Sequence, residues 1–481
     1  MTAHVETALS TIEQELEQLV LDDRLPGLAV GIVEDQELAW FRGFGASDLA
    51  TGQPANEHTL HRVASITKTL TTAAVLQLRD EDLLALDDPL EQHLPEFSAV
   101  QETAGLRREV TIRRLLTHRS GLVTETPLPT WGADEFPTRE EVLAALPQTE
   151  IVLPSDHAFK YSNLAFGLLG EVVARLSGRD YFEHVQSRLL DPLGMTDSTF
   201  WLNDSDRGRL AVGYSPDLFR DELAAAPYVG LGGVAACGQL HASVADLSRW
   251  LSLQFRTRDR TIPGDVLREQ TLREFHQPQY AEPDWSAAQC LGWRALRVGD
   301  HVYHGHGGGI FGFASQILFS AEHRLGVITL ANLWPYPLIQ PVAVRVLERL
   351  LGNTDPPPLV PTHLNPPNLP TSQPRPAEHP GDDDLAGLYV ARPGVPVHVA
   401  HRNGELCLEI SPLWPYPLHS GGTLEATPDP TRYRIRGGRA AGEVATFEFN
   451  DAGHATGFTL GGFVYRRKMG SEMGSEQGSM G

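Results

Sequence analysis

Residues 61–68 read His-Arg-Val-Ala-Ser-Ile-Thr-Lys, and the apolar residues that follow recur at helical spacing, which predicts a helix that begins at or near Ser65. On this helix Lys68 lies one turn after Ser65 and on the same face. A serine hydroxyl is a poor nucleophile until a base removes its proton, and a partly desolvated lysine amine can do so. Arginine could not serve, because it does not deprotonate, and only Lys68, Lys160 and Lys468 are lysines in this chain. The pair indicates a nucleophile with its base or, more simply, a capped helix with a surface lysine.

A second element is Tyr161-Ser162-Asn163, which directly precedes an apolar helical run that ends at Gly178. A tyrosine hydroxyl near a lysine can share or relay its proton, and we expect Tyr161 to do so. We expect Asn163 to orient Lys68 and to hydrogen-bond an amide of the substrate. The alternative is structural: Ser162 or Asn163 caps the helix, and Tyr161 packs its ring.

A third element is the glycine-rich stretch of residues 304–313, which reads His-Gly-His-Gly-Gly-Gly-Ile-Phe-Gly-Phe. Glycines allow a substrate to approach the backbone closely. A strand edge there could donate a backbone N–H to an oxyanion, together with the N–H of Ser65 at its helix N-terminus. His304 and His306 could instead hold a metal, but no further histidine or carboxylate follows at short spacing, so no metal site is predicted.

The three elements resemble, in this order, the three motifs of the serine β-lactamase and penicillin-binding-protein superfamily, and most closely its class C-like branch. The matching residues are Ser65-x-x-Lys68, Tyr161-x-Asn163 and His306-x-Gly308. The segments at 115–122 (LLTHRSGL) and 192–197 (PLGMTD) are similar to further parts of that branch, so the resemblance covers about residues 5–350. It implies an α/β (α+β) fold, in which an antiparallel sheet is flanked by helices and a helical subdomain carries Tyr161.

The resemblance also implies an acyl-transfer mechanism without metal or organic cofactor. Ser65 attacks a carbonyl, Lys68 and Tyr161 accept and return its proton, and water later releases the acyl group. The N–H groups of Ser65 and Gly309 are expected to stabilise the oxyanion, with Gly308 lining the same site. No G-x-S-x-G elbow occurs, which disfavours an α/β-hydrolase.

The sequence departs from the resemblance at His306, where lactamases and many cell-wall transpeptidases have lysine. An imidazole with an unperturbed pKa near 6.5 is mostly neutral at pH 7 and holds a substrate carboxylate less firmly. Resistance-type hydrolysis of β-lactams is therefore disfavoured.

The length of 481 residues predicts more than one domain. Between Asp355 and Pro380 the chain contains ten prolines, a composition that excludes helix and central strand and predicts an extended linker. We therefore expect a catalytic domain at 1–354, a linker at 355–380, and a separate module at 381–468. The last thirteen residues, 469–481, repeat Gly, Ser, Met and Glu and are expected to form a flexible tail.

The module at 381–468 has the pattern of a small antiparallel β-barrel. Apolar residues alternate at 395–399 and 406–410 on either side of Asn403-Gly404, which predicts a hairpin. Further short strands are expected at 432–436, 444–449, 457–460 and 463–466. The module is similar to the lipocalin-like domain of some cytoplasmic D-amino-acid peptidases of this superfamily, and it could cover the mouth of the site or mediate assembly.

Charge and composition limit the classes of molecule that the protein can bind and the places where it can be located. A formal net charge of −22 repels a phosphate backbone, so nucleic acid is excluded as a partner, and no apolar run is long enough to span a bilayer. Three distant cysteines, Cys237, Cys290 and Cys407, predict separate buried thiols rather than disulfides. Acidic residues near the N-terminus replace the apolar core of a signal peptide, so we expect a cytoplasmic protein.

These observations predict a serine hydrolase with a Ser65 acyl-enzyme, acting as a peptidase or amidase on short peptides, including those of D-amino acids. The alternatives within enzymes are a carboxylic-ester hydrolase and a weak β-lactamase. The alternative from another class is a non-catalytic protein that binds β-lactams or peptidoglycan fragments. The substrate is a small molecule or peptide, and self-association into a homo-oligomer stays open.

Overall fold

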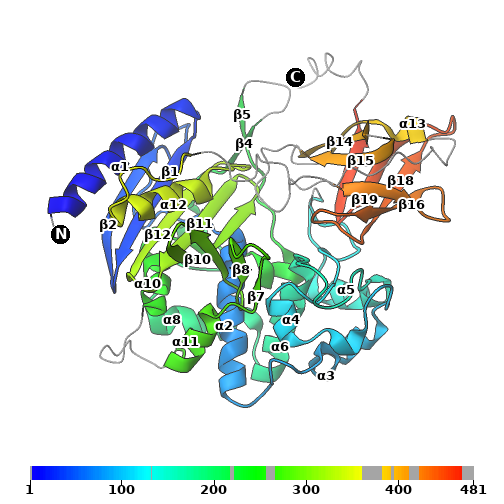
Figure 1. Ribbon diagram of the computed structural model, residues 1–481, viewed down its shortest axis with the longest axis horizontal. Coiled ribbons are helices and arrows are strands. Elements are labelled where there is room, and N and C mark those ends of the chain that lie inside the picture. The colour runs from blue at the N-terminus through cyan, green and yellow to red at the C-terminus, as the bar shows by residue number, and fades with distance from the viewer. Residues whose placement is uncertain are drawn as a thin grey trace.

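The computed structural model describes residues 3–131, 133–216, 222–255, 266–359, 382–391, 395–402, 404–410 and 422–468. Figure 1 shows a larger part, in which helices cover a sheet, and a smaller β-barrel beside it. The α/β fold predicted from the sequence is therefore confirmed. Among the described residues, no helix combines the length and the apolar character needed to cross a membrane.

An eight-stranded antiparallel sheet forms the centre of the larger part. In spatial order its strands are β2 (Glu37–Gly45), β1 (Gly27–Glu34), β12 (Leu325–Ala331), β11 (Phe313–Ser320), β10 (His301–Ile310), β9 (Arg294–Val298), β8 (Ala287–Gln289) and β7 (Tyr280–Ala281). The β-rich runs at 27–33 and 37–44, which are separated by a turn-like segment at 34–36, predict a hairpin, and β1 and β2 confirm it. Asp35 in its turn has a φ of +55°, a left-handed conformation that aspartate tolerates. Two-stranded ladders join β3 (His61–Arg62) to β6 (His241–Ala242), and β4 (Tyr214–Pro216) to β5 (Leu223–Ala225).

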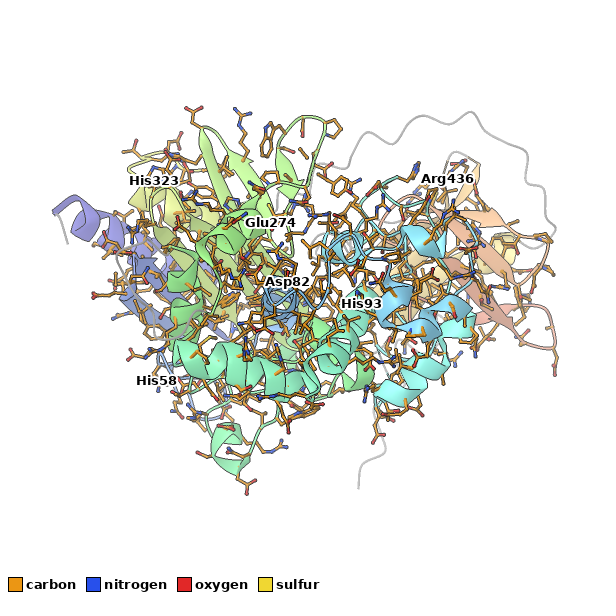
Figure 2. The ribbon with its side chains drawn as sticks, turned by 90° about the horizontal axis from the view of Figure 1, so that it is seen from below. His58, Asp82, His93, Glu274, His323 and Arg436 are labelled. Atoms are coloured by element: carbon orange, nitrogen blue, oxygen red, sulfur yellow. The ribbon has the colours of Figure 1, made fainter. Side chains whose placement is uncertain are left out.

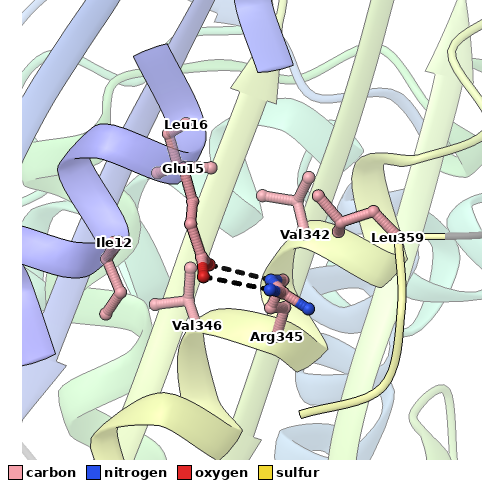
Figure 3. Close-up of a pocket in the computed structure, with 7 residues that line it drawn as sticks. All are labelled: Ile12, Glu15, Leu16, Val342, Arg345, Val346 and Leu359. Carbon is pink, nitrogen blue, oxygen red and sulfur yellow. Dashed lines mark hydrogen bonds and ion pairs between the residues drawn. The ribbon is translucent and has the colours of Figure 1, made fainter. Parts of the chain in front are cut away.

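Helices cover both faces of this sheet because alternate residues of its central strands are apolar on both sides. On β1, Val30 belongs to the apolar cluster shared with α1 (Ala3–Asp22) and α12 (Ile339–Leu350), whereas Ala29 belongs to the cluster shared with α10 (Val244–Gln254). From residue 9 onward, apolar residues recur at helical spacing among acidic ones, which predicts an amphipathic opening helix, and α1 confirms it. Figure 3 shows how α1 is fastened to α12: Glu15 forms two hydrogen bonds to Arg345, at 2.8 and 2.9 Å, with apolar side chains around them.

The remaining helices lie largely to one side of the sheet (Figure 1). They are α2 (Thr67–Asp80), α3 (Leu90–His93), α4 (Ile112–Leu116), α5 (Arg139–Ala144), α6 (Asn163–Ser177), α7 (Tyr181–Val185), α8 (Asp191–Leu193), α9 (Asp204–Arg207) and α11 (Glu269–His276). Helices α2 and α6 are almost entirely buried and pack against each other. The predicted helical region that carries Tyr161 is thus built around α6, whose first residue is Asn163.

The antiparallel β-barrel predicted for this region is confirmed, and eight strands close it. They are β13 (Gly387–Ala391), β14 (Val395–Arg402), β15 (Glu405–Ile410), β16 (Gly422–Ala426), β17 (Arg432–Arg436), β18 (Val444–Phe449), β19 (Ala455–Leu460) and β20 (Phe463–Arg467), and a short helix, α13 (Asp382–Leu385), precedes them. The sequence patterns predict six of these strands but not β13 or β16. Most of the linker predicted at 355–380, the tail at 469–481 and Asn403 lie outside the described residues, and the domain boundaries stay a prediction.

Candidate active site

Ser65 lies in a short 3-10 turn, η1 (Ala64–Ile66), between β3 and α2. Ala64 has a φ of +46°, a left-handed conformation that residues other than glycine adopt only when the surroundings enforce it. The hydroxyl of Thr67 donates to the Ala64 carbonyl at 2.7 Å and so supports this turn. Within residues 61–70, Ser65 is the one residue that is not fully buried. The turn therefore presents the Ser65 hydroxyl from an otherwise buried segment.

Lys68 follows one turn later and is completely buried. Its Nζ donates to Ser65 Oγ at 3.0 Å, to Asn163 Oδ1 at 2.8 Å and to the carbonyl of Cys237 at 2.7 Å. A lysine ammonium has three donors, so these contacts use all of them. If Lys68 loses a proton, it keeps two donors for Asn163 and Cys237 and gains a lone pair that faces Ser65. The geometry thus suits proton exchange between Lys68 and Ser65.

Tyr161 reaches the same hydroxyl from the segment before α6. Its Oη lies 2.9 Å from Ser65 Oγ. Two cations flank its ring, with Lys68 Nζ at 4.9 Å and Arg439 Cζ at 4.8 Å from the centroid. Arg439 belongs to the barrel, in the loop between β17 and β18. Such cations are attracted to the electron-rich face of the ring and add positive charge close to Ser65.

Asn163 links Lys68 to a buried carboxyl group. Its Nδ2 donates to Glu125 Oε1 at 2.6 Å, which turns its Oδ1 toward Lys68. The side chain of Glu125 is 1% exposed, and burial raises its pKa to about 7 although Arg439 and Asn163 counteract this shift. The structural alternative proposed for this segment also holds, because Ser162 caps α6 by accepting from the N–H of Ala165 at 2.9 Å.

His118, in the LLTHRSGL segment, packs its ring against the ring of Tyr161. The centroids of the two rings are 4.4 Å apart. His118 Nδ1 accepts from the N–H of Ser162 at 3.1 Å, and its carbonyl accepts from the N–H of Lys160 at 2.8 Å. Burial, together with the charge of Lys68, holds the pKa of His118 well below its usual range, so the ring is neutral and Nδ1 keeps the lone pair that this contact needs.

Strand β10 brings Gly308 against the turn that holds Ser65. A Cβ at position 308 would lie 2.3 Å from the Val63 carbonyl oxygen and 3.0 Å from the Ser65 nitrogen, so only glycine fits. Ser315 on β11 donates to the same Val63 carbonyl at 2.8 Å. Gly309 follows on the strand, where an added Cβ would meet the indole of Trp334 at 2.4 Å. Close packing thus requires glycine at both positions, against the Ser65 turn at Gly308 and against Trp334 at Gly309.

His306 occupies the same strand and is half-buried. Its Nδ1 lies 2.6 Å from the carbonyl of Gly307, which can only accept, so Nδ1 carries the proton and Nε2 is an acceptor in the neutral ring. Burial and the nearby Lys68 lower the pKa of His306 to about 3. The nitrogen Nε2 of His304 lies instead 3.0 Å from the carbonyl of His276. Within the part of the chain that the structure describes, no three His, Cys, Asp or Glu side chains are grouped to hold a metal.

Four residues at this site were not identified from the sequence. Cys237 contributes only its carbonyl, and no side-chain signal marks that role. His118 and Glu125 lie in or just after the LLTHRSGL segment, which sequence analysis found but assigned no role. Arg439 belongs to a glycine-rich loop of the barrel, far away in the sequence. Glu125 alone carried a usable signal, as a carboxylate inside a stretch that is otherwise apolar or hydroxylated.

Comparisons with known proteins identify the family and the fold of the chain. Residues 10–348 match the family described as Beta-lactamase. Protein flp of Staphylococcus aureus (strain MRSA252) is 25% identical over 325 residues, which make up 67% of this chain and 63% of that protein, so the chain matches less than two thirds of this relative's length. The octameric penicillin-binding protein homologue from Pyrococcus abyssi superposes with a TM-score of 0.61 at 21% sequence identity. The alignment covers 95% of this chain and 99% of the homologue's chain. The crystal structure of SurE also superposes with a TM-score of 0.61, at 23% sequence identity. That alignment covers 97% of this chain and 99% of the SurE chain. Because the family match extends over most of its length, the chain belongs to the beta-lactamase family.

Proposed function

We propose that this protein is a serine hydrolase that forms an acyl-enzyme through Ser65. One observation carries the proposal: Ser65 Oγ lies within hydrogen-bond distance of both Lys68 Nζ, at 3.0 Å, and Tyr161 Oη, at 2.9 Å. A nucleophile and its base within this distance, with the base oriented by a third group, are the usual signature of covalent catalysis. Here Asn163 and the Cys237 carbonyl orient Lys68.

In the proposed reaction, Ser65 Oγ attacks the substrate carbonyl carbon while its proton moves to Lys68 or Tyr161. The N–H groups of Ser65 and Gly309 stabilise the oxyanion of the tetrahedral intermediate. The proton then passes to the leaving amine or alcohol as its bond to the carbonyl carbon breaks. Water, activated by the same pair of groups, attacks the acyl-enzyme and releases the acid.

The substrate proposed first is a short peptide or amide, with D-amino-acid residues included. Neutral His306 presents an acceptor at Nε2, which suits an N–H or O–H of the substrate better than a carboxylate. This favours a peptide or ester over a β-lactam, whose carboxylate would find no charged partner there. SurE with D-Leu, which has a TM-score of 0.58 to this chain at 23% identity, adds support for D-configured residues. A carboxylic ester is the second candidate, because the same steps apply to an alcohol leaving group.

The experiment is a side-by-side assay of D- and L-amino-acid p-nitroanilides, p-nitrophenyl esters and nitrocefin, with Ser65→Ala as the control. We expect turnover of the anilides or esters that is lost in Ser65→Ala, and weak or absent turnover of nitrocefin. Hydrolysis retained in Ser65→Ala would contradict the proposed nucleophile. Binding of penicillin or a peptidoglycan fragment without turnover of any substrate would favour the non-catalytic alternative. The octameric homologue from Pyrococcus abyssi supports testing for a homo-oligomer by light scattering.

A further inference from the structure

The loop between β17 and β18 places a buried ion pair beside the active site. Its Glu443 accepts a hydrogen bond from Lys160 at 2.5 Å, and the two side chains are 6% and 1% exposed. Lys160 Nζ also donates to the Arg439 carbonyl at 2.7 Å and to Thr124 Oγ1 at 3.2 Å, so its three donors are all used. Glu443 Oε1 accepts a second bond, from the N–H of Thr124 at 2.9 Å. One carboxylate of the barrel thus holds two segments of the larger part.

These two segments deliver the groups around Ser65. Lys160 directly precedes Tyr161, and Thr124 directly precedes Glu125. The segments are also joined to each other, since the carbonyl of Thr124 accepts from the N–H of Asn163 at 2.8 Å. A displacement of Thr124 would therefore reach Lys68 through Glu125 and Asn163, whose contacts are 2.6 and 2.8 Å long.

Attachment of the barrel does not by itself require this ion pair. The barrel also docks through the Gly462 carbonyl, which accepts from the N–H of Thr130 at 3.1 Å, and through the stacked rings of Trp131 and Phe463. Transfer of two charges out of water costs about as much free energy as their attraction returns, so a buried pair is a poor source of stability. Burial alone would raise the pKa of Glu443, but Lys160 holds it below its usual range, so the carboxylate is charged when the pair forms. What the pair adds is a fixed geometry at Lys160 and Thr124.

We propose that Glu443 of the barrel is a positioning residue for the active site, acting through Lys160 and Thr124 on Tyr161 and on the Glu125–Asn163–Lys68 contacts. The inference rests on the proposed role of Ser65. It implies that the catalytic arrangement is completed by the barrel, and that the barrel affects the rate of acylation as well as access to the site. Arg439, whose carbonyl is held by Lys160, is placed over the Tyr161 ring by the same contacts.

The test compares Glu443→Gln, the double variant Lys160→Met/Glu443→Leu and a surface control in the full-length chain. Glu405→Gln is a matched control, since Glu405 pairs with Arg436 on the outside of the barrel at 2.7 Å; Figure 2 labels Arg436. The double variant replaces both charges by apolar side chains of similar volume, a change that is often neutral or stabilising, and this gain offsets the cost of leaving the buried Thr124 N–H without its acceptor. The measurements are the rate of covalent labelling by a fluorophosphonate, kcat and KM for the best substrate, and Tm.

We expect labelling and kcat to fall about 10- to 100-fold in the double variant at nearly unchanged Tm and KM, and Glu405→Gln to behave as wild type. If Glu443 only stabilised the fold, the double variant would be labelled at the wild-type rate whatever its Tm, and that result would overturn the proposal. If Glu443→Gln does not fold, the double variant decides alone.

A readout that needs no activity separates this proposal from the one on Ser65. Amide hydrogen exchange at Thr124 and Asn163 should be faster in both Glu443 variants than in Glu405→Gln, also in a Ser65→Ala background. If the wild-type chain is never labelled, the proposed function fails while the exchange data still test the ion pair. Unchanged exchange at both amides would overturn the positioning role.

Discussion

Replacing Gly308 by alanine tests whether close packing of β10 on the Ser65 turn is needed for catalysis. The added Cβ would lie 2.3 Å from the Val63 carbonyl oxygen, 2.5 Å from Ser315 Oγ and 3.0 Å from the Ser65 nitrogen. Ordinary contact begins at 3.4 Å, so strand and turn must separate by about 1 Å at the closest contact. A displacement of this size at a reacting group costs about 10²-fold in rate, and overpacking costs about 1–3 kcal/mol of stability.

The assay is the pseudo-first-order rate of fluorophosphonate labelling, read together with Tm. Two alanine variants serve as controls. At Gly307 the one contact of the added Cβ that is shorter than 3.4 Å is to Gln316 Oε1, the far end of a flexible side chain, at 2.8 Å, and at Gly230 it meets no atom within 4 Å. We expect Gly308→Ala to label about 100-fold more slowly with a lower Tm, and both controls to stay near wild type. Equal labelling rates for Gly308→Ala and Gly307→Ala would refute the packing that places β10 beside Ser65.

Three further predictions follow from the site. Lys68→Arg keeps the positive charge but cannot supply a free amine, so we expect kcat to fall at least about 10²–10⁴-fold with little change in Tm. Activity within tenfold of wild type would contradict the role of Lys68 as the base. Burial raises the pKa of Glu125 from an ordinary value of 4.5 to about 7, so between these pH values the folded chain keeps a proton that the unfolded chain releases. The free energy of unfolding should therefore decrease as pH rises from about 4.5 to about 7. Glu125→Gln should remove about 3 kcal/mol of that decline in urea titrations across this range, and an unaltered slope would contradict the buried, protonated state. Because the pKa of His306 lies near 3, its imidazole stays neutral between pH 5 and 8, and His306→Gln should scale kcat/KM by the same factor at every pH in this range. Loss of an inflection near pH 6.5 in the variant would show instead that this imidazole titrates there.

Local sequence patterns predicted the elements whose burial alternates in a simple way. The hairpin of β1 and β2, the opening helix and strands β17 and β18 were expected close to their observed bounds, since apolar spacing follows the face that each element buries. β13 and β16 were missed: in Gly387–Ala391 the apolar residues form a continuous run rather than an alternation, and Gly422–Ala426 is short and half-polar. Periodicity cannot separate such segments from loops.

The predicted site residues came from spacing and residue chemistry, and in the structure a chain of hydrogen bonds runs from Tyr161 through Ser65 and Lys68 to Asn163. Their catalytic roles stay proposals. The residues that support them could not be read from the sequence, because Glu443 is 283 positions from Lys160 and only tertiary packing joins them. The prediction of three buried thiols is wrong at Cys407, which is partly exposed. The cytoplasmic location and the flexible tail at 469–481 stay predictions.

The central claim, an acyl-enzyme on Ser65, is tested most directly by mass spectrometry during turnover. The protein is mixed with a slowly hydrolysed ester or penicillin and the reaction is quenched in acid. The intact mass is then measured, and the protein is digested for peptide mapping. The proposed mechanism predicts a single added acyl group on the peptide that contains Ser65, formed more slowly in Lys68→Arg and absent in Ser65→Ala. An adduct on another residue, or turnover of the substrate by Ser65→Ala at the wild-type rate, would contradict it.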